Sequence, residues 1–138
     1  MRIIGLDYGE ARIGVAVSDM LETIANPLDT ISERDYEKQL EKVIEVVKRE
    51  RAEKIVVGLP KRMDGTMGHR AEYTKAFAEE LGKRCDLPIC LFDERLSSSE
   101  AHRMLETGGV SGKKRKTKVD KIAAVLILQT YLDSQIKF

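Results

Sequence analysis

The sequence predicts a single α/β domain with a mixed sheet, and three observations support this fold class. The chain has 138 residues, which is the usual length of one domain. Two apolar strand-like segments, residues 2–8 and 12–18, are separated by too few residues for the crossover that a parallel pair requires. Later apolar segments at residues 54–59 and 88–92 alternate with helical patterns, as parallel strands covered by helices do. We therefore expect one domain over residues 1–138, with an antiparallel hairpin at its start.

The composition excludes several classes of protein. Hydrophobic residues make up 42% of the chain and charged residues 34%, unlike a disordered or low-complexity sequence. No stretch of about 18 apolar residues is present, so no membrane-spanning segment is expected. Asp7 interrupts the apolar stretch that a secretory signal would need, and we expect a cytoplasmic protein that acts at no membrane. Without a secretory context, Cys85 and Cys90 are expected to be free thiols.

Local patterns predict the elements between the hairpin and residue 92. Residues 27–31 are expected to form a short third strand. Ser32 is expected to cap a helix beginning at Glu33, whose apolar residues recur every three or four positions: Tyr36, Leu40, Val43, Ile44 and Val47. A second helix is marked by an apolar stripe of the same spacing: Tyr73, Phe77 and Leu81.

The last third of the chain is predicted to be helical with a basic interruption. The capping box Ser97-x-x-Glu100 opens a helix that Gly108-Gly109 ends. A basic segment follows at residues 113–118 and is expected to be a loop. The final helix is expected over residues 119–134, and its uninterrupted apolar run, residues 122–128, predicts burial nearly all round.

Asp7 is the first candidate for chemistry, because it stands at the end of an apolar strand. A buried carboxylate must be paired, lie at a hydrated edge or bind a cation. Gly5 and Gly9 leave open space around it, which would allow a phosphate to approach closely. An ion pair with Arg12 across the hairpin explains Asp7 equally well, and the two interpretations stay open.

Two further candidates also stand at element ends. Asp93 and Glu94 follow an apolar strand and point to opposite faces of the sheet, so only one of them can join Asp7, and alternation does not say which. Asp120 enters the most hydrophobic helix of the chain, where it could equally be a favourable charge in the first helical turn. Three carboxylates without a histidine or cysteine cluster favour a hard cation, Mg²⁺ or Mn²⁺. His69 and His102 are isolated and are expected to be ordinary surface residues.

Basic residues near these acids predict contacts with nucleic acid. The net charge is only +1, so nucleic-acid binding depends on how the charges are distributed over the protein. Phosphate backbones bind clusters of cations, and the candidate cations are Arg12, Lys61, Arg62, Arg70, Lys113, Lys114, Arg115, Lys116 and Lys118. A flexible, solvated loop is the alternative interpretation of residues 113–118. The chain has only seven aromatic residues, four Tyr and three Phe, most of them at core spacings, so a base-stacking surface of the RNA-recognition-motif type is not expected.

Six short motifs occur in a fixed order along the chain: Ile4-Gly5-Leu6-Asp7-Tyr8-Gly9, Arg12-Ile13-Gly14-Val15-Ala16-Val17-Ser18-Asp19, Val57-Gly58-Leu59-Pro60, Asp64-Gly65-Thr66, Asp93-Glu94-Arg95-Leu96-Ser97 and Val119-Asp120-Lys121-Ile122-Ala123-Ala124. As an ordered set they closely resemble the YqgF-type family of Holliday-junction resolvases and pre-16S ribosomal RNA nucleases, over essentially the whole chain. The resemblance implies a ribonuclease H-like fold with a mixed five-stranded sheet and helices on both faces.

The same resemblance implies a divalent-metal nuclease that matures the 5′ end of pre-16S rRNA in the bacterial cytoplasm. It implies that Asp7, Glu94 and Asp120 are the catalytic and metal-binding acids, and so selects Glu94 over Asp93. Ser97 and Ser98 stand where family members often carry a Thr pair, a change that keeps a hydroxyl at the helix cap.

Three functions compete on these observations. The first is a Mg²⁺- or Mn²⁺-dependent phosphodiesterase acting on pre-rRNA or on branched DNA, as a monomer or a homodimer. The second is a nucleic-acid-binding module without cleavage, acting in ribosome assembly or transcription. The third is nucleotide hydrolysis, because a Gly-x-Asp-x-Gly strand also opens actin-like ATPases; those need two such domains, and 138 residues supply one.

Overall fold

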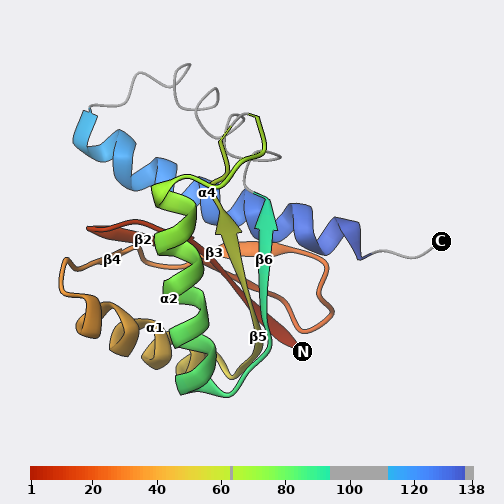
Figure 1. Ribbon diagram of the computed structural model, residues 1–138. Helices are drawn as coiled ribbons and strands as arrows, with labels where there is room; N and C mark the ends of the chain where they lie inside the picture. Colours follow the sequence, from red (N-terminus) through yellow and green to blue (C-terminus); the bar gives the residue numbers. More distant parts are fainter. Residues whose placement is uncertain (63, 94–111, 136–138) are drawn as a thin grey trace.

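The computed structural model describes residues 1–62, 64–93 and 112–135, and for residues 112–120 it describes the backbone alone. A mixed sheet forms the centre of the molecule (Figure 1). Its strand order is β3-β2-β1-β5-β6, and a further short strand, β4, also pairs with β2. The strands are β1 (Arg2–Tyr8), β2 (Arg12–Ser18), β3 (Ala25–Pro27), β4 (Ile31–Ser32), β5 (Ala52–Leu59) and β6 (Ile89–Asp93).

The predicted hairpin and parallel strands are confirmed. β1 and β2 pair antiparallel, with Asp7 opposite Gly14, while β1, β5 and β6 run parallel to one another. The predicted single strand over residues 27–31 is wrong in detail, because two short strands pair with opposite ends of β2. The six described strands therefore occupy five positions across the sheet.

Helices cover both faces of the sheet (Figure 1). The helices α1 (Tyr36–Glu50) and α2 (His69–Cys85) lie on one face, and α4 (Gly112–Ser134) crosses the other. Each face has its own apolar core. On one side, Phe77 of α2 and Leu40 of α1 belong to the same core as Leu6 of β1. On the other side, Ala124 and Leu128 of α4 belong to the same core as Ile3.

The start of α1 differs from the prediction. Its N-cap is Asp35, whose carboxylate accepts a hydrogen bond from the backbone N–H of Lys38 at 3.0 Å. Ser32, the predicted cap, pairs with Arg12 in the sheet, and the backbone N–H of Glu33 donates to Ala11. Residues 32 and 33 are held by β2, so the helix begins three residues later than expected.

The basic segment at residues 113–118 is helical and not a loop, because α4 already begins at Gly112. Lysine and arginine are strong helix formers, and no glycine or proline separates this segment from the apolar part of the helix. The described side chains of α4 are also not buried all round. Beside the buried stripe, Ile122, Val125 and Leu126 remain partly exposed. The stripe itself consists of six buried residues: Ala123, Ala124, Ile127, Leu128, Tyr131 and Leu132.

Other predictions have mixed outcomes. Cys85 ends α2 and Cys90 lies in β6, and both are free thiols as expected. The predicted capping box Ser97-x-x-Glu100 and the helix that it opens, with His102, lie outside the described residues. Across the described part of the chain, none of the helices combines the length and the apolar character that crossing a membrane would need.

Candidate active site

Asp7 lies at the carboxyl end of β1 and is only 9% exposed. Side chains alternate along a strand, so Asp7 shares a face with Ile3 and Gly5. Ile3 packs in the core beneath α4, whereas Ile4 and Leu6 pack in the core beneath α1 and α2. Asp7 therefore faces the α4 side of the sheet, and the sequence places a nearly buried carboxylate there.

Glycine flanks Asp7 on both neighbouring strands. Gly14 of β2 is its direct partner. On β5, Leu6 pairs with Val57, so the next position along the parallel register is Gly58. On this face, therefore, neither neighbouring strand places a side chain directly beside the Asp7 carboxylate.

α4 approaches the sheet closely next to this acid. A Cβ atom added to Gly5 would stand 2.7 Å from Cβ of Leu128 and 3.3 Å from the carbonyl oxygen of Ala124. The helix runs back across the sheet against the direction of β1, with its N-terminal part at the carboxyl end of that strand (Figure 1). Asp120 lies one helical turn before Ala124, toward the Asp7 end of the strand. The side chain of Asp120 is outside the described part of the chain.

The alternation of β6 separates Asp93 from Asp7. Phe92 packs in the core beneath α4, and its ring meets Tyr131 of α4 edge-on at 6.2 Å. Asp93 is the next residue, so alternation assigns it to the α1–α2 face. The sequence left Asp93 and Glu94 as alternatives, and the observed alternation removes Asp93 from the Asp7 face. Glu94 itself lies outside the described residues.

The expected carboxylate cluster is not tested by the described side chains. Within residues 1–62, 64–93 and 121–135, no three His, Cys, Asp or Glu side chains gather closely enough to hold a metal ion. Of the predicted acids, that part of the chain includes the Asp7 side chain alone. Its carboxylate oxygens and its near burial fit a hard divalent cation.

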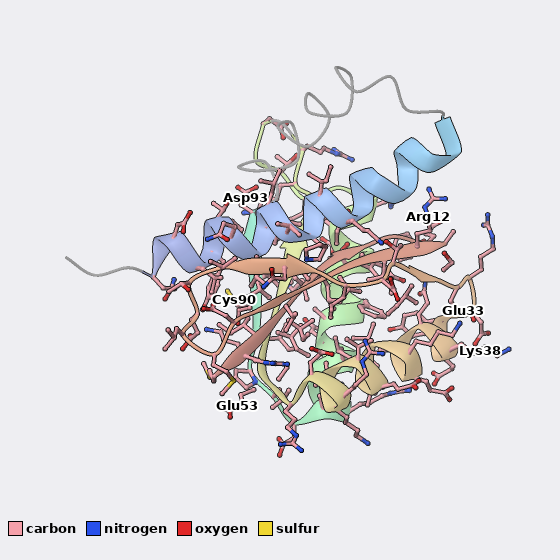
Figure 2. The ribbon with its side chains drawn as sticks, turned by 180° about the vertical axis from the view of Figure 1, so that it is seen from behind. Arg12, Glu33, Lys38, Glu53, Cys90 and Asp93 are labelled. Atoms are coloured by element: carbon pink, nitrogen blue, oxygen red, sulfur yellow. The ribbon has the colours of Figure 1, made fainter. Side chains whose placement is uncertain are left out.

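Arg12 begins β2 on the same face as Asp7. Even-numbered β2 residues face α4, as Ala16 does in that core, and Arg12 is the diagonal neighbour of Asp7 across the hairpin. The β1–β2 connection is tight, since a Cβ on Gly9 would stand 2.6 Å from the carbonyl oxygen of Arg12. Figure 2 shows Arg12 beside the N-terminal half of α4. The position of Arg12 is therefore compatible with both roles predicted for it, an ion pair with Asp7 and a contact to substrate.

Three other predicted cations gather at the same edge of the sheet. Lys61 and Arg62 follow the carboxyl end of β5, and Arg70 lies in the first turn of α2. The Arg62 side chain lies against Gly68, where an added Cβ would meet its Nε at 2.9 Å. The loop after Leu59 thus reaches the sheet edge where β1 ends, as the sequence analysis required for a shared basic surface.

The remaining cations, Lys113, Lys114, Arg115, Lys116 and Lys118, occupy the first turns of α4. No acidic residue stands in the first turn of this helix. Cations there oppose the helix dipole, and a bound polyanion would relieve that repulsion.

Gln39 is a site-supporting residue that the sequence analysis missed. Its side chain is 1% exposed, and its amide nitrogen donates to the carbonyl oxygens of Gly9 at 3.2 Å, Glu10 at 3.0 Å and Glu33 at 2.8 Å. Its carbonyl oxygen accepts a hydrogen bond from the Tyr8 hydroxyl at 3.2 Å. Burial, with the nearby Tyr36 and Glu10, raises the pKa of Tyr8 and keeps it a donor. In the sequence, the position of this glutamine beside Leu40 in the apolar stripe of α1 could have indicated its burial.

The strand order, the acid at the end of the first strand and the helix that crosses it define a ribonuclease H-like domain. Solved structures share this fold across nearly the whole chain. T. thermophilus RuvC in complex with a Holliday junction substrate has a TM-score of 0.61 at 14% identity, over 98% of this chain and 96% of that one. A Fowlpox virus resolvase bound to Holliday junction DNA has a TM-score of 0.57 at 15% identity, over 99% and 100%.

The family model described as RuvX, Holliday junction resolvase, matches residues 1–134, and the chain belongs to this nuclease family. A relative from Halothermothrix orenii is 48% identical over 137 residues, covering 99% of this chain and 98% of the relative. A second, from Listeria monocytogenes, is 50% identical over 136 residues, covering 97% and 99%. Both carry the name "Putative pre-16S rRNA nuclease". The family resemblance drawn from the sequence motifs is confirmed.

Proposed function

We propose that this protein hydrolyses phosphodiester bonds in pre-16S rRNA, with Asp7, Glu94 and Asp120 as the acids that hold a divalent cation, Mg²⁺ or Mn²⁺. The observation that carries the proposal is Asp7: a nearly buried carboxylate, flanked by glycines, on the face that α4 crosses. In open α/β sheets, ligands bind outside the carboxyl ends of the strands, which is where Asp7 lies. The names of the relatives support pre-16S rRNA as the substrate.

The residues divide the chemistry between them. A divalent cation bound by carboxylates supplies an activated water and stabilises the leaving oxygen. Asp7 offers oxygen ligands from a rigid strand, and glycine neighbours leave room for the scissile phosphate. Arg12, Lys61, Arg62 and Arg70 contact the phosphate backbone, and such contacts position a substrate without reading its sequence. We expect this activity in the cytoplasm, where pre-rRNA is processed.

Replacing Asp7 by Asn tests this assignment. The variant keeps the volume and hydrogen-bonding capacity of the side chain but loses the charge, so we expect a native fold and a loss of Mn²⁺-dependent cleavage of at least about a hundredfold. Cleavage of a labelled pre-16S 5′ fragment measures the effect, and circular dichroism checks the fold.

Asp93→Asn and Glu94→Gln form a matched pair for the same assay. Asp93 lies on the opposite face from Asp7, so its variant should cleave like the parent chain, whereas Glu94→Gln should be inactive. An Asp7→Asn protein that cuts as well as the parent would contradict the assignment. Mn²⁺ binding by calorimetry near neutral pH is expected for the nuclease, and its absence would favour a binding module without cleavage.

Branched DNA is the second candidate substrate. The matching family is named for Holliday junction resolution, and two solved structures of the same fold hold junction DNA. A resolvase acts on a two-fold junction as a dimer. Side-by-side cleavage of the rRNA fragment and a four-way junction, with the oligomeric state measured by light scattering, separates the two substrates.

A further inference from the structure

An open groove lies on the α1–α2 side of the sheet, directly beyond the end of β1. It has a volume of about 360 Å³, and its lining comes from the β1–β2 turn and the starts of both helices: Tyr8, Glu10, Arg34, Tyr36, Gln39 and Tyr73. A smaller hollow continues it toward Arg70 and Thr74 of α2. Small-molecule sites commonly have volumes of about 300–1,000 Å³, so the groove can accept one ring system.

Three of the residues that line this groove are tyrosines, and Phe77 packs beneath two of them. The rings of Tyr8 and Phe77 stack with their centroids 4.2 Å apart, and Tyr36 meets Phe77 edge-on at 6.0 Å. Tyr73 also lines the groove and is 61% exposed, so its ring is accessible to a partner.

The charges around the groove favour an anion. Arg34 and Arg70 stand at its rim, both exposed, and neither has an ion-pair partner among the described residues. Glu10 is the carboxylate of the described lining.

Two nearby carboxylates share one arginine as their ion-pair partner. Arg84 donates to Glu37 at 2.8 Å and to Glu80 at 3.0 Å. The same hydrogen bond from Arg84 lowers the pKa of Glu37. The described lining of the groove therefore holds two guanidinium groups, those of Arg34 and Arg70, and one carboxylate next to an exposed tyrosine ring.

We propose that this groove binds an unpaired base of a single-stranded nucleic acid, with the base stacked on Tyr73 and the flanking phosphates held by Arg34 and Arg70. Every base has a face that can stack on an aromatic ring, and arginine beside the ring holds the backbone, which is the chemistry of single-strand binding. Arg70 and Tyr73 are three residues apart on α2 and therefore lie on one helix face.

The position of the groove connects it with the proposed nuclease site, and the inference rests on that function for its role. Tyr8 follows Asp7 directly, so a nucleic-acid strand that passes over the carboxyl edge of the sheet would reach both the groove and Asp7. The substrate class that this favours is one with an unpaired stretch next to the scissile bond. The sequence predicts no stacking surface of the RNA-recognition-motif type; this groove is of another kind, built by two helix starts and not by a sheet face.

Binding measured in EDTA separates this inference from catalysis. The probes are labelled uridine and thymidine oligomers of about 12 nucleotides, a length within the range that single-strand binding modules contact, and an RNA duplex of equal length. By fluorescence anisotropy, Tyr73→Ala should weaken binding of the single strands at least about fivefold, the loss expected for one stacked base. Tyr73→Phe, which keeps the ring, should bind like the parent chain, and duplex binding should not change.

Two control variants test the location of the site. Leu21→Ala shortens an 81%-exposed side chain in the connection between β2 and β3, away from the groove, and should not alter binding. Arg70→Gln should weaken binding of single strands, whereas Arg49→Gln, in the last turn of α1, should not. The inference is overturned if Tyr73→Ala binds single strands as the parent does, or if it weakens single-strand and duplex binding equally. If the protein does not cleave the rRNA fragment but its variants change single-strand binding as expected here, the single-strand site is supported and the proposed nuclease function is not.

Discussion

A single buried amide, that of Gln39, fixes the turn that follows Asp7. Its nitrogen is shared among three carbonyl oxygens from two chain segments, and its oxygen accepts from Tyr8. Gln39 therefore links α1 to the strand that carries the candidate acid.

Gln39→Leu should destabilise the fold by about 1–3 kcal/mol, because a buried amide loses its hydrogen bonds to three partly buried carbonyl oxygens while the side-chain volume hardly changes. Urea unfolding measures the loss. Gln129 offers a matched control: it also bonds two backbone groups, Ala25 N–H and Thr23 C=O, but at the partly exposed surface of α4. Gln129→Leu should cost less, since water replaces the lost partners. Equal losses from the two variants would contradict the role given to Gln39.

At the scale of one residue, Gly5 shows a limit of what sequence can reveal. The sequence indicated that Gly5 leaves space near Asp7, and the strand was predicted correctly. What Gly5 accommodates is a helix from the far end of the chain, whose Leu128 Cβ would stand only 2.7 Å from a Cβ added to Gly5. No local pattern encodes a contact over such a separation, so the reason for the glycine emerges only from the fold.

Helix α1 shows how an element's boundary depends on its neighbours. Its apolar stripe was predicted correctly, because helical spacing is a property of the sequence alone. The predicted start of the helix was wrong, because Ser32 and Asp35 are both good N-cap residues and only the pairing of β4 with β2 decides between them. A residue held in a sheet ladder cannot also cap a helix.

The two candidate caps give a direct test at this scale. Asp35→Ala should destabilise the protein by about 0.5–2 kcal/mol, because the backbone N–H of Lys38 loses its acceptor. Ser32→Ala should stay within about 0.5 kcal/mol of the parent, as most exposed substitutions do. Thermal unfolding followed by circular dichroism compares the two. A larger loss from Ser32→Ala would mean that the helix begins where the sequence alone placed it.

For the whole molecule, topology explains which parts of the candidate site could be placed from the sequence. Parallel strands end at one edge, so Asp7, the loop with Arg62 and the end of β6 meet there without any long-range information. Alternation in the sequence left Asp93 and Glu94 open, and the family resemblance selected Glu94. The contact of Phe92 with α4 then assigns Asp93 to the face opposite Asp7. The exposure of Tyr73 likewise depends on how two helices pack, and its spacing had suggested a core residue.

The helical basic segment of α4 gives the last prediction, and it concerns the charge of the whole carboxyl edge. Lys114 and Lys118 are one helical turn apart, and replacing both by Gln preserves helix propensity while removing two charges. If both contact phosphates, the slope of log affinity against log salt should fall by about 0.9 per lost contact on duplex nucleic acid. Lys48→Gln with Lys83→Gln, in the last turns of α1 and α2, removes the same charge from the opposite edge and should leave the slope unchanged. Equal changes in the two double variants would show that net charge, and not this helix, attracts the substrate.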